Sequence, residues 1–136
     1  DVVSFIVEEE YGWVTAISPH SGLLIGYIWR TSDYPWVNIW RHVMDGKPFA
    51  RGLEFGTTGL HKTGRDLVAK GSIFDRPLYR YIDADETQTF KYAMFLSEVP
   101  EGFSGVQSVR YTGSKLEVLE NNASGRRVTL DVMSPF

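Results

Sequence analysis

Residues 36–56, WVNIWRHVMDGKPFARGLEFG, hold two strand-like runs joined by a turn segment. The runs at 36–42 and 49–56 are rich in aromatic and β-branched residues, which favour strands. Between them, Gly46 supplies a positive φ angle and Pro48 fixes its own φ, as in tight turns. The stretch therefore predicts an antiparallel β-hairpin.

The same alternation of strand-like runs and turn residues recurs along the whole chain, with turn chemistry at 18–22 and 112–114. Amphipathic helical periodicity is scarce, and the only predicted helix is a turn or two at 65–70. The predicted strands are 2–7, 11–17, 23–30, 36–42, 49–56, 78–83, 87–96, 106–112, 115–120 and 127–132. The sequence thus predicts an all-β protein, an antiparallel β-sandwich.

The length of 136 residues and the hydrophobic content of 43% suit a single domain spanning 1–136. The chain begins at Asp1, directly in a β-rich run, so we expect it to be part of a longer parent chain. Its formal charge of −3, with the two signs interspersed, argues against nucleic acid or an anionic membrane as a partner. The longest apolar stretch, 23–29, is too short to cross a bilayer, so we expect a soluble protein.

Glu54 lies between two glycines in a predicted strand. Because strand side chains alternate between faces, Gly52, Glu54 and Gly56 share one face, while Arg51 points to the other. Glycine in a strand often marks the close approach of a ligand, and a polyol would need such cleared space around a carboxylate. Alternatively, the glycines mark a bulge and Glu54 is a solvated or ion-paired residue. The spacing alone leaves both interpretations open.

Trp36, Asn38, Trp40 and His42 share one face of the preceding strand. This face combines flat rings with amide and imidazole groups. A sugar offers an apolar face of C–H groups and a rim of hydroxyls, so it suits such a surface. In the alternative, the tryptophans fill the core, and Asn38 then needs a buried hydrogen-bond partner.

The sequence gives little support to a metal site or a cofactor site. Cysteine is absent, and the three histidines, His20, His42 and His61, show no metal-ligand spacing, so we expect no metal. No phosphate-binding loop is present, and we expect no cofactor. The acidic segment 83–86 is most simply a solvated turn rather than a calcium site.

Three segments resemble the galactose-mutarotase-like family, which includes the aldose 1-epimerases. TSDYP at 31–35 is similar to the family's Thr-Asp-x-Pro segment, and LEFGT at 53–57 is similar to its Leu-Glu-Pro-x-Thr segment, with Phe55 in place of proline. YIDADET at 81–87 resembles the Leu-x-Pro-Gly-Glu-Thr turn before the last core strand. The resemblance covers roughly residues 12–96, and it implies a supersandwich or its C-terminal half.

In that family a glutamate removes the proton of the anomeric hydroxyl while a histidine protonates the ring oxygen. The resemblance implies that Glu54 is this base, and that the family's histidines belong to the half that would precede Asp1. It implies a carbohydrate-binding domain that interconverts sugar anomers as an isomerase. The alternatives are a non-catalytic carbohydrate-binding module and a structural half of a larger sugar-active enzyme.

Two further expectations concern partners. Arg51 and Arg41 carry the charge needed to clamp an acidic sugar, although the alternation of side chains puts both on the face opposite Glu54. A sheet edge left exposed tends to pair with another strand, so we also expect a homodimer formed through such an edge.

Overall fold

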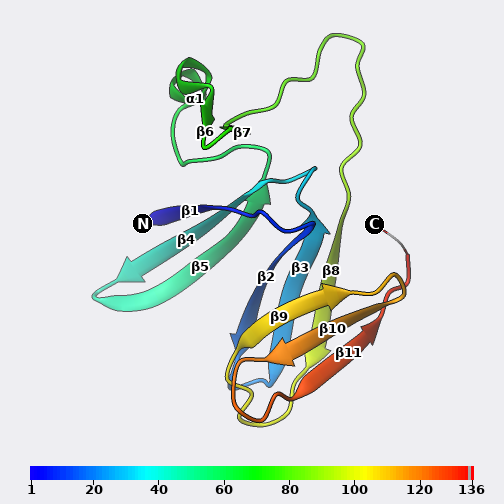
Figure 1. Cartoon of the computed structure of the whole chain (residues 1–136). Helices are drawn as coiled ribbons and strands as arrows, with labels where there is room; N and C mark the ends of the chain where they lie inside the picture. The colour runs from blue at the N-terminus through cyan, green and yellow to red at the C-terminus, as the bar shows by residue number, and fades with distance from the viewer. Residues whose placement is uncertain (135) are drawn as a thin grey trace. The chain divides into compact units, whose positions relative to one another are not determined.

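The computed structural model describes residues 1–134 and 136, and it is all-β, as predicted (Figure 1). Its strands form several antiparallel sheets, which is consistent with a β-sandwich. The chain divides into two compact units. Unit 1 comprises Asp1–Gly12 and Arg30–Lys91, and unit 2 comprises Trp13–Trp29 and Tyr92–Phe136.

Unit 1 is built on a three-stranded antiparallel sheet in the order β1-β4-β5. Strand β1 is Val2–Ile6, β4 is Trp36–Met44 and β5 is Lys47–Gly56, and Figure 1 shows them side by side in blue and turquoise. The predicted hairpin is confirmed, with both strands extending two residues closer to the turn. Asp45 and Gly46 have φ angles of 50° and 74°, the positive pair that a two-residue hairpin turn requires.

The second part of unit 1 is a small helical and hairpin subdomain. Helix α1 spans Gly64–Lys70 and confirms the predicted helix. Thr63 caps it by accepting a hydrogen bond from the Asp66 amide at 3.3 Å, and Gly71, with φ 76°, ends it. The short strands β6 (Ser72–Ile73) and β7 (Arg76–Pro77) form a hairpin after the helix.

The core of unit 1 gathers around Trp36, which is 2% exposed and packs with Leu67 and Leu78. The indole Nε1 of Trp36 donates a hydrogen bond to the Pro77 carbonyl at 2.7 Å. Its ring also lies against Gly59, where a Cβ would come within 2.2 Å of the indole. This contact explains why glycine occupies position 59, since any side chain there would displace a buried ring.

Two predicted strands are wrong in whole or in part. Residues 78–83 form no strand, and the predicted strand 87–96 is replaced by β8, which spans Tyr92–Glu98. The acidic segment closes on itself instead, because the Asp83 amide donates to the Glu86 carboxylate at 3.0 Å and the Glu86 amide donates to the Asp83 carbonyl at 3.1 Å. These local bonds occupy backbone groups that a sheet would need.

Unit 2 contains two three-stranded antiparallel sheets. One has the order β2-β3-β8, with β2 at Tyr11–Ser18 and β3 at Leu23–Arg30, so the first residues of β2 and the last of β3 belong to unit 1. The other has the order β11-β10-β9, with β9 at Val106–Tyr111, β10 at Lys115–Glu120 and β11 at Arg127–Asp131. The apolar strand β3 is the central strand of its sheet.

The β10–β11 connection of unit 2 is held by a fully buried carboxylate, Glu120. Arg126 binds it with two nitrogens, Nε at 2.6 Å and Nη2 at 2.8 Å, and the Ser104 amide donates to it at 2.9 Å. The hydrogen bonds from Arg126, above all, lower the pKa of Glu120 to about 2. A buried charge is tolerated here because its oxygens have hydrogen-bond donors.

Candidate functional site

The two faces of the β1-β4-β5 sheet differ sharply in chemistry. Residues directly opposite each other in an antiparallel sheet share a face. The register places Ser4 opposite Asn38, and Asn38 opposite Glu54, while Trp40 lies opposite Gly52. The Glu54 face, as we call it, carries Val2, Ser4, Ile6, Trp36, Asn38, Trp40, His42, Ala50, Gly52, Glu54 and Gly56. The opposite face carries Val3, Phe5, Val37, Ile39, Arg41, Arg51, Leu53 and Phe55.

Trp40 and His42 form a flat aromatic platform on the Glu54 face. Their ring centroids are 5.5 Å apart and the ring planes differ by 7°, so the rings are stacked. Phe49 supports the imidazole edge-on, at 5.7 Å and 83°. Trp40 remains 36% exposed, whereas His42 is half-buried. The platform therefore presents an accessible indole on a supported base.

Glu54 is exposed and stands beside this platform. A Cβ on Gly52 would lie 3.2 Å from the Glu54 Oε1 atom and 3.4 Å from the Trp40 Cβ, so the carboxylate occupies the space above Gly52 next to Trp40. The only register shift of the β4–β5 pair falls at His42 and Val43, not at the glycines, so the glycines do not mark a bulge. Among the residues that the structure describes, Glu54 forms no ion pair.

Asn38 is half-buried and fixed in place by hydrogen bonds. The Ser4 hydroxyl donates to its Oδ1 atom at 2.6 Å, and its Nδ2 atom donates to the Thr58 carbonyl at 3.4 Å. These contacts supply the partner that the sequence required for Asn38. Ser4, Asn38 and Glu54 thus form one polar row across three strands, next to the aromatic platform.

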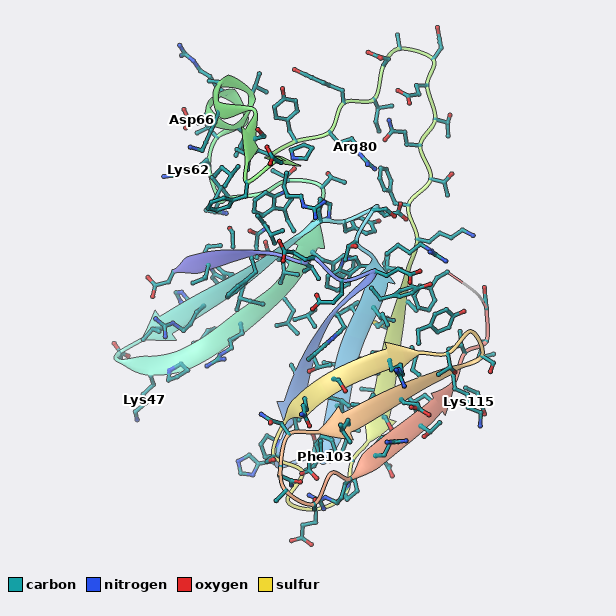
Figure 2. The ribbon with its side chains drawn as sticks, viewed as in Figure 1. Lys47, Lys62, Asp66, Arg80, Phe103 and Lys115 are labelled. Carbon is teal, nitrogen blue, oxygen red and sulfur yellow. The ribbon has the colours of Figure 1, made fainter. Side chains whose placement is uncertain are left out.

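An open groove of about 640 Å³ runs along this part of unit 1. It is lined by Asp1, by Val2, Val3 and Ser4 of β1, by Trp40, and by Leu60, His61 and Lys62. The last three come from the loop before α1, where Figure 2 shows Lys62. Leu60 has a φ angle of 62°, and the Lys62 amide donates to the Leu60 carbonyl at 3.0 Å, so a tight turn presents His61 and Lys62.

His61 and Lys62 cannot be recognised as site residues from the sequence, because nothing in the local pattern shows that their loop folds back toward Trp40. The one available signal was Gly59, whose missing side chain allows the loop to approach Trp36 closely. A close approach to β4 brings the residues that follow Gly59 near the same strand. That inference needs the identity of the neighbouring strand, which the sequence does not provide.

Of the predicted substrate-binding residues, Asn38, Trp40 and His42 share the Glu54 face with the predicted base. Trp36 lies in the core of unit 1, where its indole nitrogen is already bonded to Pro77. Arg51 lies on the opposite face, as the alternation of side chains predicts, and lines a separate groove there. The structure therefore gathers Glu54 with three of the five predicted substrate-binding residues, while Trp36 is buried and Arg51 is on the other face.

Residues 1–134 and 136 contain no group of three or more His, Asp or Glu side chains arranged to hold a metal ion. Within the same residues, no helix is both long and apolar enough to cross a membrane. Comparisons with protein-family models, with curated proteins and with solved structures found no match. The resemblance to the galactose-mutarotase-like family therefore stays a prediction.

Proposed function

We propose that the Glu54 face of unit 1 binds a carbohydrate. The observation that carries this proposal is the exposed, stacked Trp40–His42 platform beside a carboxylate that has no ion pair among the described residues. The indole suits the C–H face of a pyranose ring, while Glu54 accepts hydrogen bonds from its hydroxyls. Asn38 and Ser4 are engaged with each other, so they shape the polar side of the site.

The groove beside the platform has a suitable size and lining for a sugar. Its volume of about 640 Å³ lies within the roughly 300–1,000 Å³ that is usual for small-molecule sites. His61 and Lys62 add hydrogen-bond donors on the side of the groove away from the strands. A sugar resting on Trp40 is therefore within the reach of groups that accept hydrogen bonds and groups that donate them.

Binding is tested by titrating the unmodified protein and the Trp40→Ala variant with glucose, galactose, mannose and glucuronate, and proton NMR follows each titration. Truncating a central aromatic anchor should weaken binding of the preferred sugar at least about tenfold. Phe74→Ala is the matched control, because Phe74 is 85% exposed and lies outside the groove. Equal affinity in the Trp40→Ala variant and the unmodified protein would contradict the proposed platform.

Anomer interconversion is the second candidate, and the presence of His61 in the groove beside the platform favours it. Glu54 would take the proton of the anomeric hydroxyl, and His61 would give a proton to the ring oxygen as the ring C–O bond breaks. Reclosure on the other face of the carbonyl returns both protons. This assigns general-base and general-acid roles to two groups of unit 1.

Catalysis is tested by proton NMR of anomer exchange with the unmodified protein, Glu54→Gln and His61→Gln. We expect each substitution to reduce the exchange rate by roughly 100-fold, the usual contribution of a positioned acid or base. Glu98→Gln, an exposed carboxylate of unit 2, is the control and should leave the rate unchanged. Sugar binding without any acceleration would instead support a non-catalytic module, or half of a larger enzyme.

A further inference from the structure

The opposite face of the β1-β4-β5 sheet holds a second groove, of about 260 Å³. Its apolar lining comes from Val3, Phe5 and Ile39, and its charged lining comes from Arg41, Arg51 and Asp1. Val3 and Phe5 are 53% and 51% exposed, so much of their apolar surface faces solvent. Exposed apolar surface rimmed by charge is typical of binding sites.

The charges in this groove are unbalanced. Arg41 and Arg51 lie directly opposite each other on β4 and β5, an arrangement in which like charges destabilise a sheet. Asp1 pairs with Arg41, with 2.6 Å between Oδ2 and Nη2, but this pair is exposed. Arg51 is exposed and has no ion pair with any residue described by the structure. The groove thus holds excess positive charge in a chain whose formal charge is −3.

We propose that this groove binds a small organic carboxylate with an apolar body. The carboxylate would lie between Arg51 and Arg41, because a guanidinium binds a carboxylate with two parallel hydrogen bonds. The apolar body would rest on Phe5, Val3 and Ile39. The volume is smaller than that of sites enclosing drug-sized ligands, so the occupant is small. An anion in this position relieves the repulsion between the two arginines.

This groove shares Asp1 and Val3 with the groove beside Trp40, but its two arginines line this groove and not the other. Successive side chains of a strand point to opposite faces of the sheet, so Arg51 and Glu54, three positions apart, lie on opposite faces. Substitution of Arg51 therefore removes no side chain from the carbohydrate site, and substitution of Glu54 removes none from this groove. The two proposals can fail separately, because loss of sugar binding says nothing about carboxylate binding on the opposite face.

The test uses 3-phenylpropionate as the probe and 3-phenylpropan-1-ol as its uncharged counterpart, with amide chemical shifts followed by NMR. We expect a dissociation constant on the order of millimolar for the acid. Arg51→Gln should weaken it roughly tenfold, because a charge-assisted hydrogen bond is lost. Arg65→Gln, on exposed α1, is the matched control. Asp1→Asn should tighten binding, since Asp1 competes with the ligand for Arg41.

The shift changes should map to Phe5, Ile39 and Arg51, which line this groove and not the one beside Trp40, and should persist in the Glu54→Gln variant. Equal affinity for the acid and the alcohol would overturn the proposal. So would equal losses in Arg51→Gln and Arg65→Gln, or shift changes confined to the Glu54 face. Matching amide spectra of the free variants outside the substituted strand would show that each variant is folded.

Discussion

At the scale of single residues, the space above Gly52 matters most for the proposed site, because the Glu54 carboxylate occupies it. The glutamate between two glycines was visible in the sequence, and so was the alternation that places Arg51 on the other face. The position of the carboxylate above Gly52, next to Trp40, was not, because it depends on the cross-strand register. His61 and Lys62 were missed for a related reason, since a loop's direction is set by tertiary contacts.

Gly52→Ala should separate function from stability. The new Cβ would lie 3.2 Å from the Glu54 Oε1 atom, so the carboxylate must shift and sugar affinity should fall. Glycine inside a strand costs about 0.5–1 kcal/mol relative to alanine, so the free energy of unfolding should be unchanged or slightly higher. The measurements are a sugar titration by NMR and chemical denaturation.

Gly56→Ala is the control for that substitution. The nearest heavy atom to a Cβ there is 3.7 Å away, an ordinary contact, so sugar affinity should not change. If Gly52→Ala and Gly56→Ala bind the sugar equally well, the space above Gly52 has no role in the site.

At the scale of elements, hairpins were predictable and isolated strands were not. The β4–β5 hairpin has a local signal, Asp45-Gly46, between two strand-like runs. Residues 78–83 have the same aromatic and β-branched composition but no strand partner. Tyr79 and Tyr81 instead contact each other edge-on at 5.0 Å, and the next residues form the turn closed by Glu86. Strand composition alone therefore fails where pairing is not local.

Another element-scale feature absent from the sequence prediction is the Glu120–Arg126 pair. Glu120 has a folded-state pKa of about 2, below its ordinary value of 4.5. A carboxyl group with a lowered pKa stabilises the fold above its unfolded-state value, and this contribution is lost as the pH falls through the folded-state value. The contribution of Glu120 should therefore be complete above about pH 4.5 and disappear toward pH 2.

This pH dependence is measured by chemical denaturation of the unmodified protein and Glu120→Gln from pH 7 to pH 2. The difference in unfolding free energy between the two should be constant near neutral pH and shrink below pH 4.5. Glu117→Gln is the comparison, because its partner Arg127 is 3.8 Å away and 58% exposed. A difference that stays constant down to pH 2 would rule out the lowered pKa.

At the scale of the whole molecule, the all-β class followed from composition and turn spacing, but the division into two units did not. The unit boundary falls inside the strands β2 and β3, where the sequence shows no linker or change of composition. Contacts between distant parts of the chain set this boundary. Local patterns predict individual elements well, but they say little about how those elements are grouped.

The sheet edge of unit 2 allows the expected homodimer to be tested. Strand β8 is an edge strand in the order β2-β3-β8, and its Met94 and Leu96 side chains are 60% and 62% exposed. Exposed apolar edges tend to pair, so we expect self-association that Met94→Lys weakens. Light scattering across a concentration series measures it, and a monomeric mass at the highest concentration would contradict the dimer.

Amide chemical shifts, mapped during titration with the panel sugar that binds best, test directly whether the Glu54 face of unit 1 binds a carbohydrate. We expect changes that cluster at 38–42, 52–54 and 60–62, together with broadening of the Trp40 indole signal. Changes confined to unit 2 or to the opposite face, or no change with any sugar of the panel, would contradict this proposal.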